Sequence, residues 1–334
     1  MPFSDIPGNG RIKKILRHAL GRRRVPNSLL LSGPPGVGKR RFAAVLAQAL
    51  NCLTLEDDAC GVCPNCLATA RGLEDPERGF PDVLRIEHFK NKEEILIDQV
   101  QELRSIAYLT PMIGRNKVFI IDEADRMNAE ASNCLLKVLE EPPRTSHIVL
   151  VTNNPSRILR TIRSRCQNLA FLPVSGEDIE NALRERGLEE EKVRILALLV
   201  HGNLEQALNV DWDEIQARRE AAWELFRELV GGDEPSRFLK RFAAQKKVEI
   251  KENLAGTLEL VSSFCRDLVL LRDGGDPRLL LNPDFEPRMR AGGAGAAFDR
   301  ALRFLAAVDG AFAGLDQNLN MNLLINTLYS QVIG

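Results

Sequence analysis

A glycine-rich segment that ends in lysine is the first place where this sequence could do chemistry. Residues 33–40 read Gly-Pro-Pro-Gly-Val-Gly-Lys-Arg, which follows the phosphate-binding Walker A pattern G-x-x-x-x-G-K-[ST] up to its last position. Gly33, Gly36 and Gly38 let backbone N–H groups point at phosphate oxygens, and Lys39 can reach the β- and γ-phosphates. An apolar run precedes the segment and an amphipathic stretch follows it, so a nucleotide site is favoured over a glycine-rich turn with a solvated lysine.

The residue after this lysine departs from the pattern. Position 40 holds arginine, whereas the usual Ser or Thr hydroxyl coordinates Mg²⁺. A guanidinium has donors only and repels a cation, so we expect no Mg²⁺ at this site. Either Arg40 turns away and nucleotide binds weakly, or the site does not turn over ATP. We favour a loop that has kept its shape and lost its hydrolytic role, and whether ATP or ADP occupies it stays open.

Acidic and polar side chains follow two predicted strands. Val118–Ile121 is a run of four apolar residues that leads into Asp122 and Glu123, the arrangement of a Walker B strand. In such a strand Asp122 would hold Mg²⁺ through its water shell and Glu123 would orient the attacking water. Beside Arg40 we expect Glu123 to be vestigial. The next predicted strand is followed by Asn153, which could touch the γ-phosphate or serve only the turn that follows, since asparagine is common in turns.

Four of the seven cysteines lie close together, at Cys52, Cys60, Cys63 and Cys66. The two-residue spacings give tight turns that suit a tetrahedral zinc–thiolate site, and four thiolates with no open position favour a structural over a catalytic zinc. Two disulfides, a redox-active C-x-x-C pair and an iron–sulfur cluster are the alternatives, and a reducing cytosol disfavours the disulfides. We interpret Cys134 and Cys265 as core residues.

The arrangement of predicted elements indicates an α/β fold followed by an all-α part. Short apolar runs separated by helical patterns imply a mainly parallel sheet covered on both faces. The predicted strands are Ser28–Ser32, Asp82–Ile86, Val118–Ile121, His147–Thr152 and Asn168–Leu172. After Pro173 the periodicity is helical almost to the end, except for a Gly- and Pro-rich stretch at Asp273–Gly295 that we expect to be a loop. The expected domains are 1–172, 173–210 and 211–334.

Charge and hydropathy exclude some classes of protein. Lys plus Arg is 45 and Asp plus Glu is 46 in 334 residues, a formal net charge of −1, which disfavours a uniformly basic nucleic-acid binder. The start lacks the features of a signal peptide, and no apolar run approaches the ~20 residues of a membrane helix, so we expect a cytoplasmic protein without a membrane partner. The basic stretches at Lys13–Lys14 and Arg22–Arg24 are either solvated helix faces or contacts to DNA phosphates made within a larger assembly.

Three segments resemble the AAA+ family and, within it, the bacterial clamp loaders of DNA polymerase III. Residues 135–143 read Leu-Leu-Lys-Val-Leu-Glu-Glu-Pro-Pro and residues 161–166 read Thr-Ile-Arg-Ser-Arg-Cys, like two motifs of clamp-loader subunits. Residues 318–328 are similar to the last helix of the family's collar domain. The resemblance implies a RecA-like parallel-sheet domain with a zinc module at 52–66, a small helical lid domain and a C-terminal helical collar that mediates oligomerisation.

The resemblance also implies a role without ATP turnover. Motor subunits of the family keep Ser or Thr after the Walker lysine and carry a nucleotide-sensing arginine in the lid, but the matching segment Gly202–Leu208 contains no arginine. The family pattern makes Arg165 an arginine finger that acts in trans on a neighbouring ATPase subunit. The alternatives for Arg165 are capping a helix end or pairing with a nearby acid.

The partners implied are the gamma/tau and delta subunits in a hetero-pentamer, with the sliding clamp and primed DNA contacted through the assembly. Two other classes of function remain. An active ATPase motor, of a clamp loader or a branch-migration complex, would use Lys39, Asp122 and Glu123. A stand-alone zinc-dependent DNA-binding protein is disfavoured by the near-neutral charge.

Overall fold

The computed structural model describes residues 1–75, 80–88, 94–231, 247–292, 295–316 and 321–333. The chain divides into two compact units, each with its own hydrophobic core. The first unit comprises residues 1–188 and 200–208, and the second comprises residues 189–199 and 209–334. The first unit contains the sheet, and the second is helical.

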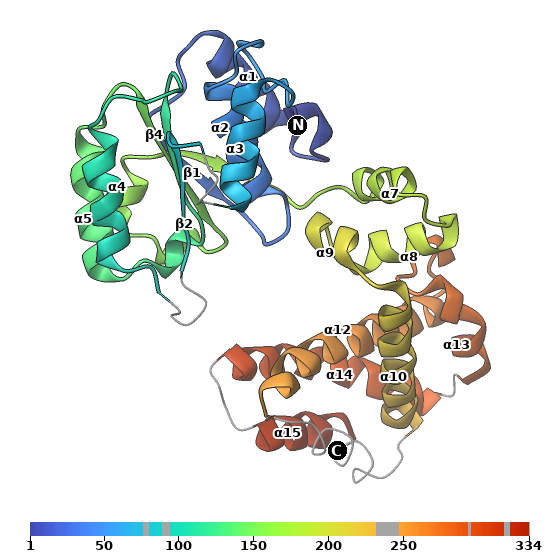
Figure 1. Ribbon diagram of the computed structural model, residues 1–334. Helices are drawn as coiled ribbons and strands as arrows, with labels where there is room; N and C mark the ends of the chain where they lie inside the picture. Colours follow the sequence, from blue (N-terminus) through green and yellow to red (C-terminus); the bar gives the residue numbers. More distant parts are fainter. Residues whose placement is uncertain (76–79, 89–93, 232–246, 293–294, 317–320, 334) are drawn as a thin grey trace. The chain divides into compact units, whose positions relative to one another are not determined.

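A five-stranded parallel sheet forms the centre of the first unit (Figure 1). Its strands are β1 (Ser28–Ser32), β2 (Val83–Ile86), β3 (Lys117–Ile121), β4 (Ser146–Thr152) and β5 (Gln167–Ala170). Their order across the sheet is β2-β3-β4-β1-β5, and each neighbouring pair is parallel. β1, β3 and β4 are buried along their whole length, which explains why they are apolar runs rather than alternating patterns. The expected α/β sheet is confirmed.

Helices cover both faces of this sheet (Figure 1). On one face lie α1 (Gly10–Gly21), α2 (Lys39–Leu50) and α3 (Pro64–Glu74), and on the other α4 (Ile97–Ala107) and α5 (Ala129–Glu140). The short helices are η1 (Phe3–Asp5), η3 (Ala124–Arg126), η4 (Pro155–Arg157) and α6 (Arg160–Arg163). After β5, the chain forms α7 (Gly176–Glu185), and it returns to this unit shortly before α9 (Leu204–Asn209).

Parallel strands give this sheet two chemically different edges. The loops that follow β1, β3 and β4 all leave from the carboxyl edge, and they carry the phosphate loop, Asp122 and Asn153. The loops that enter the same strands lie at the amino edge. One topology therefore gathers the predicted nucleotide residues although they are far apart in sequence.

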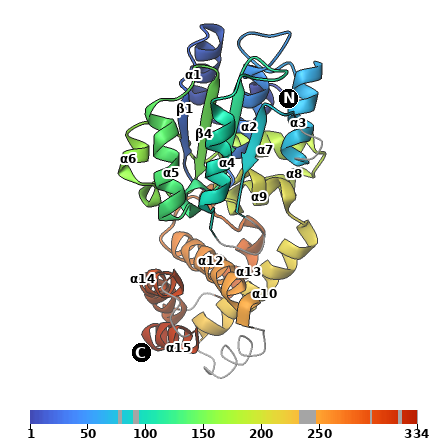
Figure 2. The same ribbon diagram turned by 60° about the vertical axis from the view of Figure 1, so that its left-hand side comes forward.

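The second unit is a helical assembly in which α10 (Trp212–Gly231), α12 (Lys247–Arg272), α14 (Gly295–Asp316) and α15 (Met321–Ile333) pack side by side (Figures 1 and 2). It also contains α8 (Glu190–Leu199), α13 (Glu286–Gly292), η5 (Pro277–Leu279) and η6 (Pro283–Phe285). Its core is rich in aromatic side chains, which include Trp223, Phe226, Phe264, Phe285 and Phe304. The fully buried Arg219 donates to Asp284 at 2.8 and 2.7 Å, so its charge is neutralised inside the unit.

The predicted loop at Asp273–Gly295 is wrong in its second part, because α13 lies there. Pro287 is the second residue of that helix, where proline is tolerated because it costs no intrahelical hydrogen bond. Met289 and Phe285 are buried at 2% exposure, so tertiary packing stabilises the segment. Residues 318–320 of the predicted collar helix lie outside the described residues, and α15 begins at Met321. None of the helices in the described part of the chain is long and apolar enough to cross a membrane.

Candidate functional site

The phosphate loop connects β1 to α2 and closes on its own lysine. Gly36 and Gly38 have φ of 69° and 92°, a left-handed backbone that glycine adopts at little cost. Lys39 is 4% exposed, and its Nζ donates to the carbonyl oxygens of Gly33, at 2.7 Å, and of Pro34. Burial lowers the pKa of Lys39 to about 8, although the carboxylates around it act in the opposite direction. Two of the three N–H donors of the ammonium group are thus engaged by the loop itself.

Arg40 turns toward the Walker B aspartate, not away from it. Its Nε forms an ion pair with Oδ2 of Asp122. The Asp122 side chain is 4% exposed whereas that of Arg40 is 54% exposed, so the guanidinium reaches inward from the rim of the site. The second oxygen of Asp122 accepts the backbone N–H of Glu123 at 3.0 Å. A positive charge from the chain therefore stands where a hydrolysing site would place its metal ion.

Two basic side chains hold Glu123. Nε of Arg126 lies 3.0 Å from Oε2 of Glu123, and Nε2 of His88 lies 2.9 Å from the same oxygen. Glu123 itself has φ of +46°, which is uncommon for a residue with a side chain. A carboxylate held in this way is poorly suited to orient an attacking water. The spacing of His88 in the sequence gives no sign of this contact.

The polar end of β4 is organised as a turn. Thr152 donates its hydroxyl to Asp125 at 2.6 Å, and the backbone N–H of Asn154 donates to the Thr152 hydroxyl oxygen at 3.0 Å. Asn153 is exposed next to them. The sheet brings Asn153 to the same edge as the phosphate loop and Asp122, and turn hydrogen bonds account for its neighbours.

The segment at Gly202–Leu208 closes over the phosphate loop. The backbone N–H of Glu205 donates to the carbonyl oxygen of Gly36 at 3.1 Å. Asn203 caps α9 by accepting the N–H of Gln206 at 2.9 Å, and its Oδ1 lies 1.6 Å from the position that a Cβ on Gly36 would occupy. A side chain at position 36 would therefore collide with the amide of Asn203, which explains the glycine there.

Replacing Gly36 by alanine should lower the free energy of unfolding by about 1–3 kcal/mol, because the new methyl group meets Asn203 and the backbone is left-handed there. Urea denaturation would measure the change. Gly176→Ala is the matched control, since Gly176 has nothing within 4 Å of an added Cβ and its variant should stay within about 0.5 kcal/mol of the original. Equal stability of the two variants would contradict the close contact.

Arg165 follows α6 and lies against the end of α5. Its guanidinium donates to Glu140 at 2.9 Å and to the carbonyl oxygen of Thr161 at 3.0 Å. The two charged side chains remain 36% and 51% exposed. Such an exposed ion pair is worth little in water, at most about 1 kcal/mol. The pairing with a nearby acid, one of the two alternatives for Arg165, is therefore present in this chain, and its small free energy leaves the guanidinium available to a stronger anion.

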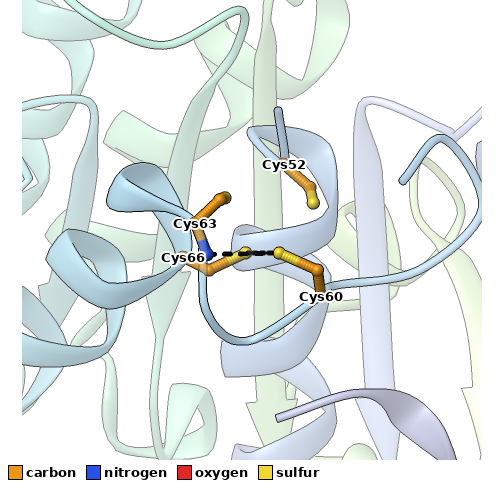
Figure 3. A group of neighbouring side chains, drawn as sticks. All are labelled: Cys52, Cys60, Cys63 and Cys66. Carbon is orange, nitrogen blue, oxygen red and sulfur yellow. Dashed lines mark hydrogen bonds between the residues drawn. The ribbon is translucent and has the colours of Figure 1, made fainter. Parts of the chain in front are cut away.

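The four clustered cysteines converge on one point between α2 and α3 (Figure 3). Their Sγ atoms all lie within 4.8 Å of one another, and those of Cys60 and Cys66 are 3.9 Å apart. A tetrahedral zinc ion with Zn–S bonds of about 2.3 Å requires sulfurs roughly 3.8 Å apart. The donor set and its spacing therefore fit a metal ion of the zinc type.

Backbone groups around the cluster favour thiolates. The N–H groups of Leu55 and Cys63 point at the sulfurs of Cys52 and Cys60, both at 3.3 Å. The backbone N–H of Val62 lowers the pKa of Cys60 to about 6, whereas burial raises the pKa of Cys66. A bound metal ion would deprotonate all four thiols whatever their intrinsic pKa. Cys134 and Cys265 are buried away from the cluster, as predicted.

A family model described as DNA polymerase III, delta subunit, matches residues 8–175, which is half of the chain. The chain belongs to this family. Over 278 residues it is 29% identical to DNA polymerase III subunit delta' of Bacillus subtilis (strain 168), covering 83% of this chain and 82% of that protein. Over 215 residues it is 31% identical to subunit tau of the same organism, covering 62% of this chain but only 37% of tau.

Among solved structures, a gamma subunit-related protein of DNA polymerase III from Thermotoga maritima aligns with 95% of this chain and 98% of its own, at 19% identity and a TM-score of 0.41. The family model and the sequence relatives identify the protein as a clamp-loader subunit, as its motifs had indicated.

Pairing of Arg165 with a nearby acid was one of the predicted alternatives, but the sequence does not identify Glu140 as the partner. Two contacts of this clamp-loader subunit were not predicted from sequence, namely Arg40 with Asp122 and Asn203 with Gly36. Each joins residues from different elements, so no local spacing reveals it. The charge at position 40 was a usable signal, because a buried Walker B aspartate needs a counter-charge and an arginine can supply it.

Proposed function

We propose that the protein is a non-motor, stator-like subunit of a bacterial DNA polymerase III clamp loader, of the delta-prime type. The observation that carries the proposal is the ion pair of Arg40 with Asp122. Phosphoryl transfer needs Mg²⁺ between the β- and γ-phosphates and a Walker B carboxylate to hold it. An arginine that neutralises this carboxylate weakens the attraction of the carboxylate for Mg²⁺, and its own positive charge repels the ion.

Two further features support a silent site, by which we mean a phosphate loop that does not hydrolyse ATP. Lys39 donates to two carbonyl oxygens of its own loop, so a bound phosphate would compete with these oxygens for the ammonium group. The closure over the loop is made by Asn203 and by the backbone of Glu205, neither of which supplies a positive side chain. If nucleotide binds here, Gly33, Gly36, Gly38, Lys39, Arg40, Asp122 and Asn153 are the residues around it.

The active contribution that we propose for this subunit is made by Arg165. In the assembled loader it would leave Glu140 and enter the ATP site of a neighbouring gamma/tau subunit, where an arginine finger stabilises the charge that develops on the transferring phosphoryl group. The subunit would also contact delta in a hetero-pentamer that places the sliding clamp on primed DNA. Residues 1–172, 173–210 and 211–334 would then act as the AAA+ body, the lid and the oligomerising collar, with zinc as a structural cofactor.

The isolated protein provides the direct test of the silent site. We expect no ATP hydrolysis above background with Mg²⁺ present, measured by phosphate release over hours at micromolar protein. Hydrolysis that disappears in Lys39→Ala would contradict the proposal and would favour an active motor that uses Lys39, Asp122 and Glu123.

Replacing Arg40 by threonine should create a magnesium-dependent nucleotide site. The change frees Asp122 and supplies the hydroxyl that the Walker A pattern requires. Regaining one charged interaction of about 1.5–3 kcal/mol corresponds to roughly 10–100-fold tighter binding of ATP with Mg²⁺, measurable by calorimetric titration with and without the metal.

Arg41→Thr is the matched control for this variant, because it removes the same charge from an exposed neighbouring position. It should leave nucleotide affinity and its dependence on Mg²⁺ unchanged. If Arg40→Thr bound ATP with Mg²⁺ no better than Arg41→Thr, the ion pair would not be what silences the site.

A further inference from the structure

A second basic site lies at the amino edge of the sheet, the edge opposite the phosphate loop. A cavity of about 710 Å³ is lined there by residues that precede β1, β3 and β4 and by the ends of α1 and α2. Four arginines line it, namely Arg23, Arg24, Arg115 and Arg144, against one carboxylate, Glu56. Its volume lies within the 300–1,000 Å³ that is usual for small-molecule sites.

The charges of this cavity do not cancel. Arg23 pairs with Glu56 at 2.6 Å, so these two neutralise each other. For Arg24, Arg115 and Arg144, no carboxylate of the described residues lies within 4.0 Å. Three guanidinium groups that repel one another therefore line one cavity without counter-charges from the chain.

The backbone that carries these arginines is firmly held. Asn51 accepts the N–H groups of both Arg115 and Asn116 at 2.9 Å through one side-chain oxygen. The amide of Asn27 donates to the carbonyl oxygens of Pro143, at 3.0 Å, and Ser146, at 2.7 Å, on either side of Arg144. The exposed arginine side chains can adjust to a ligand while the backbone that carries them stays fixed. This lowers the entropic cost of binding.

We propose that this cavity binds a small anion with two or three linked phosphates. Guanidinium groups recognise phosphate through paired N–H donors, and three of them match the charge of a di- or triphosphate. A cavity volume of about 710 Å³ suits a small molecule. Leu20, Val25 and Leu55 also line the cavity and provide apolar surface for a base or sugar, so the phosphate chain could come from a nucleotide or from inorganic oligophosphate.

Calorimetric titration of the zinc-loaded full chain, without Mg²⁺, tests this site with two probes, sodium tripolyphosphate and ATP. We expect both to bind. Arg115→Gln/Arg144→Gln should weaken binding by about tenfold or more, since each lost charged hydrogen bond costs roughly that factor. Arg11→Gln/Arg104→Gln, which removes two exposed arginines outside the cavity, should bind as the original does.

The outcomes distinguish a nucleotide from inorganic oligophosphate as the ligand, and the cavity from the phosphate loop as the binding site. Equal affinities for the two probes would assign recognition to the phosphate chain, and tighter binding of ATP would add a contribution from the nucleoside. Loss of binding in Lys39→Ala but not in the cavity variant would overturn the proposal in favour of the phosphate loop. Binding of duplex DNA but of neither probe, sensitive to the same arginines, would overturn it in favour of nucleic acid. If the double variant melts at lower temperature, Arg24→Gln replaces it.

Discussion

Replacing Arg165 by alanine should reduce the DNA-stimulated ATPase of the assembled clamp loader by about 10³–10⁵-fold at the site that this arginine serves, because that is the contribution of an arginine finger to phosphoryl transfer. The fold should not change, since within the described residues the exposed side chain hydrogen-bonds to Glu140 and to one carbonyl oxygen at the surface. The measurement is steady-state phosphate release by the complete assembly with clamp and primed DNA. Other ATP sites in the assembly set the residual rate.

Two variants control this experiment. Arg163→Ala removes an exposed arginine two residues away and should leave the rate unchanged. Glu140→Gln breaks the ion pair but keeps the finger, so it should retain the ATPase, and any requirement for Glu140 would indicate that it positions Arg165. If Arg165→Ala loaded clamps and hydrolysed ATP at the original rate, the role in trans would be wrong.

Removal of metal from the cysteine cluster should have the largest effect on stability. Metal analysis of the purified protein is expected to give about one zinc per chain. Structural zinc in small peptides contributes about 10–16 kcal/mol to folding, and here the ion would hold the connection between α2 and α3. We therefore expect Cys63→Ser to lose the metal and to lower the free energy of unfolding by several kcal/mol, measured by urea denaturation.

Cys134→Ala provides the matched control, because it removes a buried thiol that lies outside the cluster. It should keep one zinc per chain and lose only about 1 kcal/mol from the lost packing. A protein without zinc, in which all four clustered thiols react freely with a thiol reagent, would refute the metal site.

Local patterns in the sequence were sufficient to predict the sheet and the clustering of the four cysteines. β1 and β4 are runs of apolar residues because both sheet faces are covered, and the spacing of Cys60, Cys63 and Cys66 already contains the turns that bring their sulfurs together. Both signals arise within a few residues of chain. Their physical causes, burial and short-range geometry, act locally and can be inferred without knowing the fold.

Contacts that join distant elements were not predictable in the same way. His88 reaches Glu123 and Asn203 reaches Gly36 only because the chain topology brings them together. The arginines at the amino edge are similarly dispersed, and nothing at Arg115 or Arg144 indicates that they line one cavity. α13 was missed because Pro287 normally predicts a break, whereas the burial of its neighbours favours a first helical turn.

The self-contained phosphate loop has a thermodynamic consequence for this protein. A protein that binds ligand only when folded gains stability by RT ln(1 + [L]/Kd), so the stability of such a subunit follows the cellular concentration of its nucleotide. In this chain Lys39 donates to carbonyl oxygens of its own loop, and Asp122 pairs with Arg40. The carbonyl oxygen of Gly36 accepts a hydrogen bond from the backbone of Glu205. If this loop binds no nucleotide, the stability of the loop would not depend on ATP or ADP bound there.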